Sequence, residues 1–138
     1  MSITTAVCDT FTRELVNSAI THTTADTYKL ALIKPSSAGT LGQATTNYSD
    51  LSTDEVASGA GYTTGGVTLT GTTASGSGRL MLDWNDATWA TATFSAAGWL
   101  IYNSSKSNRA VAVGSFGGTF TGGGGTFTVP LTNPVQTT

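Results

Sequence analysis

Apolar residues in the first twenty positions of this chain repeat with the period of a helix. They recur at every fourth position, at Val7, Phe11, Leu15 and Ala19. Residues spaced by four lie on one face of a helix, and such a face usually packs against the core. The pattern therefore predicts one short N-terminal helix over residues 5–20, held by packing more than by helix propensity.

From residue 28 onward the period is two, which is typical of β-strands. Residues 28–33 alternate and end at Pro35, which donates no ladder hydrogen bond. Further short alternating segments follow from residue 67 to 131, separated by Gly, Ser and Asn turn residues. The pattern predicts a single all-β domain over residues 1–138, a jelly roll or β-sandwich of about eight strands.

Two local patterns refine this picture. Residues 98–102 are apolar at nearly every position, which predicts a central strand covered on both faces, and the polar residues 103–108 predict a hairpin loop after it. Residues 35–66 read as a long loop with isolated apolar residues, and residues 132–138 as an extended tail.

Composition narrows the class of partner. Charged residues make up 10% of the chain and its net charge is -2, with Thr, Ser, Gly and Asn in place of the usual Lys and Glu. The six basic residues are scattered, which argues against nucleic acid as a partner. No apolar run approaches a membrane span, and residues 1–10 lack the basic and apolar regions of a signal peptide.

Few residues offer catalytic chemistry. The single histidine, His22, reads as a surface or helix-end residue, and the single cysteine, Cys8, as a small buried hydrophobe. A hydrolase would need His22, or the carboxylates of Asp83 and Asp86, at the floor of a cleft. The spacing of Asp83 and Asp86 fits a turn better, so we expect no enzyme activity.

Cofactor and metal motifs are equally weak. The acidic residues Asp50, Asp54 and Glu55 do not have the spacing of an EF-hand calcium loop. Residues 122–125 are four glycines without the Lys-Ser/Thr of a phosphate-binding loop, which favours a flexible connector. We therefore expect neither a cofactor nor a metal. Exposed Trp84 or Trp89 would instead favour a carbohydrate-binding or adhesion module on a virion or cell surface, which is the alternative function.

Four segments resemble a known family, the small capsid decoration or cement proteins of tailed bacteriophages. They are MSITTAVC (1–8), TYKLAL (27–32), TDEVASGAGYTTGG (53–66) and the most specific, LIYNSSKSNRAVAV (100–113). The resemblance implies a β-sandwich or jelly-roll fold without catalysis or cofactor. It also implies a structural virion protein, made in the host bacterial cytoplasm, that binds the outer capsid surface and cements neighbouring major capsid protein subunits.

The regions without a regular period suggest how such a protein would bind. Extended, weakly charged segments can add hydrogen-bonded strands to a neighbouring protein. We therefore expect the loop 35–66 and the tail 132–138 to contact the capsid, and the contact candidates are Tyr48, Leu51, Tyr62, Pro134 and Val135. We also expect a homodimer, because two-fold pairs are the commonest assembly.

Overall fold

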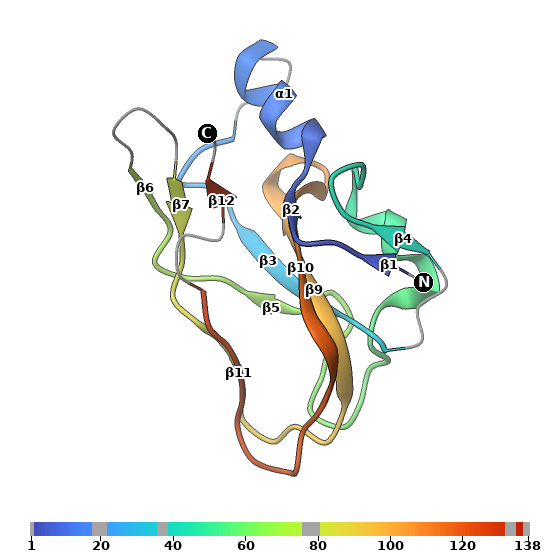
Figure 1. The fold of residues 1–138 in the computed structure, drawn as a ribbon. Helices are drawn as coiled ribbons and strands as arrows, with labels where there is room; N and C mark the ends of the chain where they lie inside the picture. Colours follow the sequence, from blue (N-terminus) through green and yellow to red (C-terminus); the bar gives the residue numbers. More distant parts are fainter. Residues whose placement is uncertain (1, 18–21, 36–38, 76–80, 132–134, 137–138) are drawn as a thin grey trace.

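The computed structural model describes residues 2–17, 22–35, 39–75, 81–131 and 135–136, and it confirms an all-β chain with one α-helix (Figure 1). Its centre is a five-stranded antiparallel sheet in the order β2–β10–β9–β3–β5. In that order its strands are Ala6–Val7, Arg109–Thr121, Ser95–Asn103, Tyr28–Ile33 and Val67–Thr68.

Three smaller sheets surround the central one. β8 (Ala87–Trp89) pairs with β11 (Phe127–Val129), and β7 (Met81–Asp83) pairs with both β6 (Thr73–Ser75) and β12 (Val135–Gln136). β1 (Ser2–Ile3) and β4 (Thr40–Leu41) form a parallel pair. The described residues thus hold twelve strands rather than about eight, because strands of two or three residues are too short to show an alternation in the sequence.

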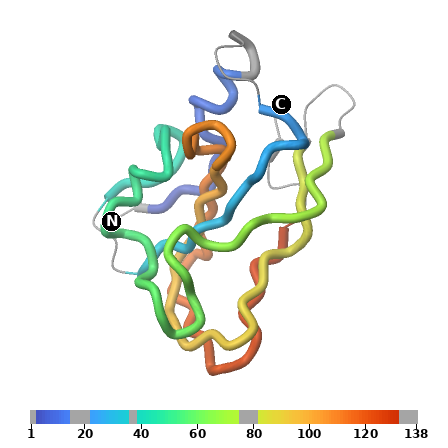
Figure 2. The backbone as a smooth tube through the Cα atoms, turned by 180° about the vertical axis from the view of Figure 1, so that it is seen from behind, coloured from blue at the N-terminus to red at the C-terminus, as the bar shows by residue number. Residues whose placement is uncertain are grey.

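The central sheet is covered on both faces, so the side chains of its strands contribute to two separate hydrophobic cores. Leu30 and Leu32 of β3 face a core shared with β7, β8 and β11, whereas Ala31 and Ile33 face a second core with Leu41. Figure 2 shows the two covering layers on opposite sides of the central strands. The predicted central strand at residues 98–102 is confirmed as part of β9, which lies between β10 and β3.

The helix is shorter than the sequence pattern predicts. α1 spans Asp9–Asn17, so residues 5–8 are not helical, and residues 18–20 of the predicted helix lie outside the described part of the chain. Val7 and Ala6 instead pair with Ala112 and Val113 as β2, and the Cys8 N–H donates to a carbonyl of β10. Pairing with the edge of β10 satisfies the backbone hydrogen bonds of residues 6–8. This pairing favours a strand at these residues although their apolar spacing fits a helix.

The described part of the segment 35–66 is packed on the sheet rather than extended as a free loop, with Leu41 and Leu51 in the second core and Tyr62 in the first. It contains β4 and the 3₁₀-helix η1 (Tyr48–Asp54), which Asn47 caps by accepting a hydrogen bond from the Ser49 N–H. Gly66 ends the segment with a φ of 84°, where an added Cβ would lie 1.9 Å from the carbonyl oxygen of Leu30. Only glycine allows this close approach to β3.

Candidate binding surface

The structure removes two of the five predicted contact residues. Leu51 is 1% exposed and Tyr62 is 2% exposed, so both side chains belong to the core and not to a partner surface. Their isolated positions in a polar segment suggested a loop, but each anchors that segment to the sheet. Val135 pairs with Leu82 as part of β12, so the described part of the tail is a strand, and Pro134 lies outside the described residues.

Tyr48, the remaining candidate, is half-buried in a cluster around Glu55. The hydroxyls of Tyr48 and Tyr62 donate to the two Glu55 carboxylate oxygens at 2.5 Å, and the Gly65 N–H donates at 2.7 Å. Burial, together with these bonds to Glu55, raises the pKa of both tyrosines. Burial also raises the pKa of Tyr102, which stacks on Tyr48, to about 12. The cluster fixes the segment 35–66 to the sheet.

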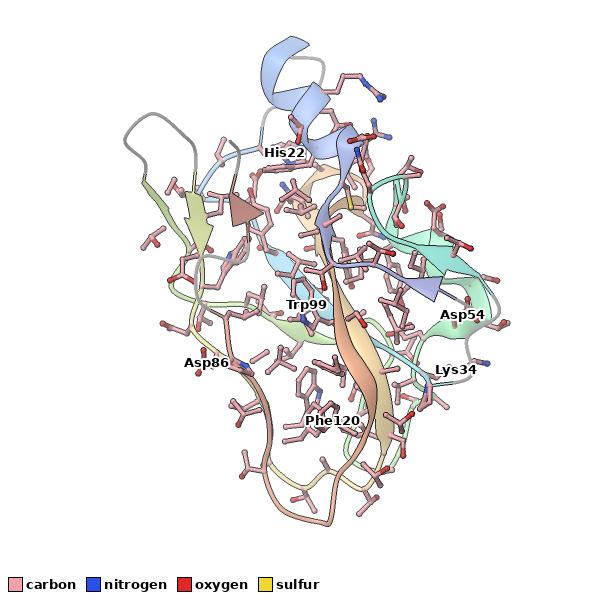
Figure 3. All side chains as sticks on the ribbon, viewed as in Figure 1. His22, Lys34, Asp54, Asp86, Trp99 and Phe120 are labelled. Atoms are coloured by element: carbon pink, nitrogen blue, oxygen red, sulfur yellow. The ribbon has the colours of Figure 1, made fainter. Side chains whose placement is uncertain are left out.

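His22 lies in a second polar cluster, beneath α1 (Figure 3), which corrects the expectation of a surface residue. Its side chain is 1% exposed, with Nε2 2.8 Å from a Glu14 carboxylate oxygen and Nδ1 3.0 Å from the Asn103 amide nitrogen. A carboxylate only accepts hydrogen bonds, so Nε2 donates. Asn103 also accepts from the Ser105 N–H through its amide oxygen, which orients its NH₂ group towards His22.

This cluster is built for structure. Both ring nitrogens of His22 are engaged by side chains of the fold, and its side chain is buried. Glu14 also pairs with Arg109 of β10, and Asp26 accepts from Asn103 and pairs with Lys106. The cluster therefore joins α1 to the β9–β10 hairpin.

The other acidic candidates have structural partners too. Asp86 accepts from the Leu131 N–H, Asp54 from the Gly39 N–H, and Asp50 from the Thr46 N–H. Within the described ranges, no group of three His, Cys, Asp or Glu residues is arranged to hold a metal ion. None of the described helices is long and apolar enough to cross a membrane.

The tryptophans that would favour a sugar-binding platform are core residues. Trp84 is packed against Tyr28, and Trp89 against Tyr62 and Phe94, with both indoles buried. Sugar-binding tryptophans expose a ring face to the ligand, which neither residue does here. The feature that would support the carbohydrate-binding alternative is therefore not found at these two positions.

A surface that the sequence did not reveal lies at the opposite end of the molecule from α1 (Figure 3). Phe120 of β10 is 53% exposed and is the only exposed large hydrophobic residue in the described part of the chain. A concavity of about 190 Å³ opens beside it. We call this surface the aromatic seam, defined by its lining residues Phe116, Phe120, Phe127, Thr128 and Pro130.

The seam continues an aromatic cluster from the core to solvent. The Phe116 ring contacts Phe120 and Phe127 with centroids 5.7 and 6.2 Å apart, and Phe127 contacts Trp89 and Phe94 inside. The inner rings fix the positions of the outer ones, so the exposed apolar surface is preformed. The exposed ring of Phe120 therefore offers a partner one apolar point of contact beside a preformed hollow.

A bulge in β10 creates the seam. Ser115 pairs with Gly98 and Phe120 with Ala96, so residues 116–119 face only one residue of β9 and are pushed outwards. Gly117 makes this possible with a φ of 77°. A second concavity of about 390 Å³ lies beside the bulge, lined by Ile3, Pro35, Ala97, Ser115, Gly117, Gly118 and Thr119. Charge patterns could not reveal either surface, because no lining residue is charged.

Comparisons with known proteins found no similar protein. No family model, no curated protein and no solved structure matches this chain.

Proposed function

We propose that this chain is a structural virion protein that binds the outside of a bacteriophage capsid and cements neighbouring major capsid protein subunits. The observation that carries the binding part of the proposal is the aromatic seam, a preformed and uncharged surface on an otherwise polar domain. The capsid as partner rests on the resemblance of residues 1–8, 27–32, 53–66 and 100–113 to phage decoration proteins.

The physical properties of the seam suit this role. A cement protein is repeated by the symmetry of the shell, so a modest contact at each copy adds up to a large stabilisation of the lattice. Burying a half-exposed aromatic ring contributes about 1–2 kcal/mol per site by area. Because the lining residues carry no charge, such a contact needs no matching charge on the capsid.

Co-sedimentation with capsids stripped of this protein tests the proposal. We expect saturable binding, and shells that carry the protein should stay intact at a temperature or low salt concentration that breaks bare shells. Binding should persist at about 1 M salt, where the Debye length is only about 3 Å and charge-driven contacts are screened. Absence of saturable binding to stripped shells would overturn the proposal, and binding without stabilisation would overturn the cementing role.

A further inference from the structure

The edge of β10 that faces away from β9 is open beyond its short contact with β2. β2 pairs with β10 only at Ala112 and Val113, and at Thr4 the chain turns away to hydrogen-bond with Leu41. Among the described strands none follows β2 along this edge, so residues 116–121 lack a strand partner there. An open edge presents backbone N–H and C=O groups that another strand can pair with.

Two concavities flank this open edge. Phe116 and Phe120 line the aromatic seam, whereas Ser115, Gly117, Gly118 and Thr119 line the larger hollow that reaches Ile3 and Pro35. Phe116 and Phe127 pack against the first core, whereas Ile3 packs against the second, so the two hollows lie on the two faces of the sheet beside the same strand edge. A strand added to this edge would direct alternate side chains into one hollow and then the other.

The residues that line the two hollows determine which side chains the added strand can carry. The seam is aromatic, and the other hollow is lined by Ile3, Pro35, Ala97, glycine backbone and hydroxyl side chains. A buried charge in either hollow would have no counter-ion among the lining residues, which is costly. The matching strand is therefore uncharged, with a large apolar side chain for the seam and a smaller one for the opposite hollow.

We propose that residues 116–121 of β10 accept an extended, uncharged strand of the major capsid protein by β-strand addition. This inference rests on the proposed function, because it names how the capsid occupies the open edge. Backbone hydrogen bonds to the edge would supply affinity, and the two hollows would supply the register.

Matched variants at the aromatic seam test whether an uncharged strand of the capsid protein binds there. Phe120→Asp places a charge in the contact and should weaken binding to stripped capsids about tenfold or more, whereas Phe120→Leu should stay within about threefold of the wild type. Thr12→Asp adds the same charge on the exposed side of α1, at the far end of the molecule, and should bind like the wild type. Circular dichroism of each variant confirms its fold, which tolerates these changes because both positions are exposed.

Hydrogen exchange of the bound protein separates strand addition from simple side-chain docking. The amides of residues 116–121 that face the open edge should gain protection on capsid binding, while those in η1 should not change. If the wild type binds but Phe120→Asp binds equally well, or the edge amides gain no protection, the inference is wrong while the proposed function stands. If the wild type does not bind, both fail. If the free protein is a dimer that Phe120→Asp converts to a monomer, a second copy occupies the edge and the inference is overturned.

Discussion

Replacing Glu14 by glutamine would test whether one buried cluster holds α1 on the sheet. The Glu14 carboxylate is 5% exposed, and it receives hydrogen bonds from His22, from Thr10 and from the guanidinium of Arg109. Glutamine keeps the size of the side chain but removes the negative charge that these donors share. It also turns one acceptor oxygen into an NH₂ donor, so the change removes the charge together with at least one of the hydrogen bonds that Glu14 accepts.

The expected loss follows from the geometry. A hydrogen bond to a charged group contributes about 1.5–3 kcal/mol, and removing one partner of a fully buried pair costs about 3–5 kcal/mol. The Arg109 side chain is 34% exposed, so water recovers part of its solvation after the change. We expect a loss of about 2–3 kcal/mol at pH 7, which in a domain of this size lowers Tm by about 8–12 °C.

The same carboxylate makes stability depend on pH. Burial opposes ionisation of Glu14, but the hydrogen bonds and charges of His22 and Arg109 outweigh burial and hold its pKa below the ordinary value of 4.5. A folded-state pKa below the unfolded one gives stability that is present above about pH 4.5 and lost as the pH falls through the folded-state pKa. Glu14→Gln should lack this component of the acid-side decline.

Thermal unfolding followed by near-UV circular dichroism, at pH 7 and in steps down to about pH 3, measures both effects. Arg13→Gln is the matched control, because it removes one charge from an exposed position of the same helix and should change stability by at most about 0.5 kcal/mol. Equal Tm values for Glu14→Gln and the wild type at pH 7, or identical acid-side slopes, would refute the role assigned to the cluster.

Three further predictions concern the core and the segment 35–66. Gly66→Ala should destabilise the fold by more than about 3 kcal/mol in chemical denaturation, because its Cβ would overlap the β3 backbone. Gly65→Ala, with a φ of 98° but no close neighbour, should cost only about 1–2 kcal/mol, and equal losses would contradict the steric argument. Burial raises the pKa of Cys8 to about 12, so its thiol should resist alkylation at pH 8 until the chain unfolds, and rapid labelling of the folded protein would count against it. Tyr62→Phe removes a donor to Glu55 and should cost about 1–3 kcal/mol in thermal unfolding, whereas no loss would show that the bond is dispensable.

The features that could be predicted from sequence are those set by neighbours along the chain. The apolar run at residues 98–102 correctly indicated a strand buried on both faces, because such a strand cannot alternate. The polar run at residues 103–108 correctly indicated the hairpin loop, in which Ser107 and Asn108 adopt positive φ values. The alternating residues 28–33 correctly indicated β3.

The features that were missed depend on contacts between distant residues. Residues 6–7 fit a helical period, but the free edge of β10 pairs with them and makes them a strand. The partners of His22 lie 8 and 81 positions away, so no local pattern could place it in a buried cluster. Phe120 follows a bulge opposite Ala97 that no local sequence pattern indicates, so its exposure could not be predicted.

The acidic residues of this chain are engaged within its own fold, which bears on how it could bind a partner. Each of the eight acidic residues interacts with groups of its own chain, by hydrogen bonds, ion pairs or electrostatic contacts: Asp9, Glu14, Asp26, Asp50, Asp54, Glu55, Asp83 and Asp86. These contacts fix α1, the hairpin and the segment 35–66, and none of the eight acidic residues lines either hollow beside β10. The strand that we propose for this edge would therefore be selected by shape and by backbone hydrogen bonds. Unpaired charges on a competing segment would be desolvated there without compensation, so the neutral lining would disfavour charged partners.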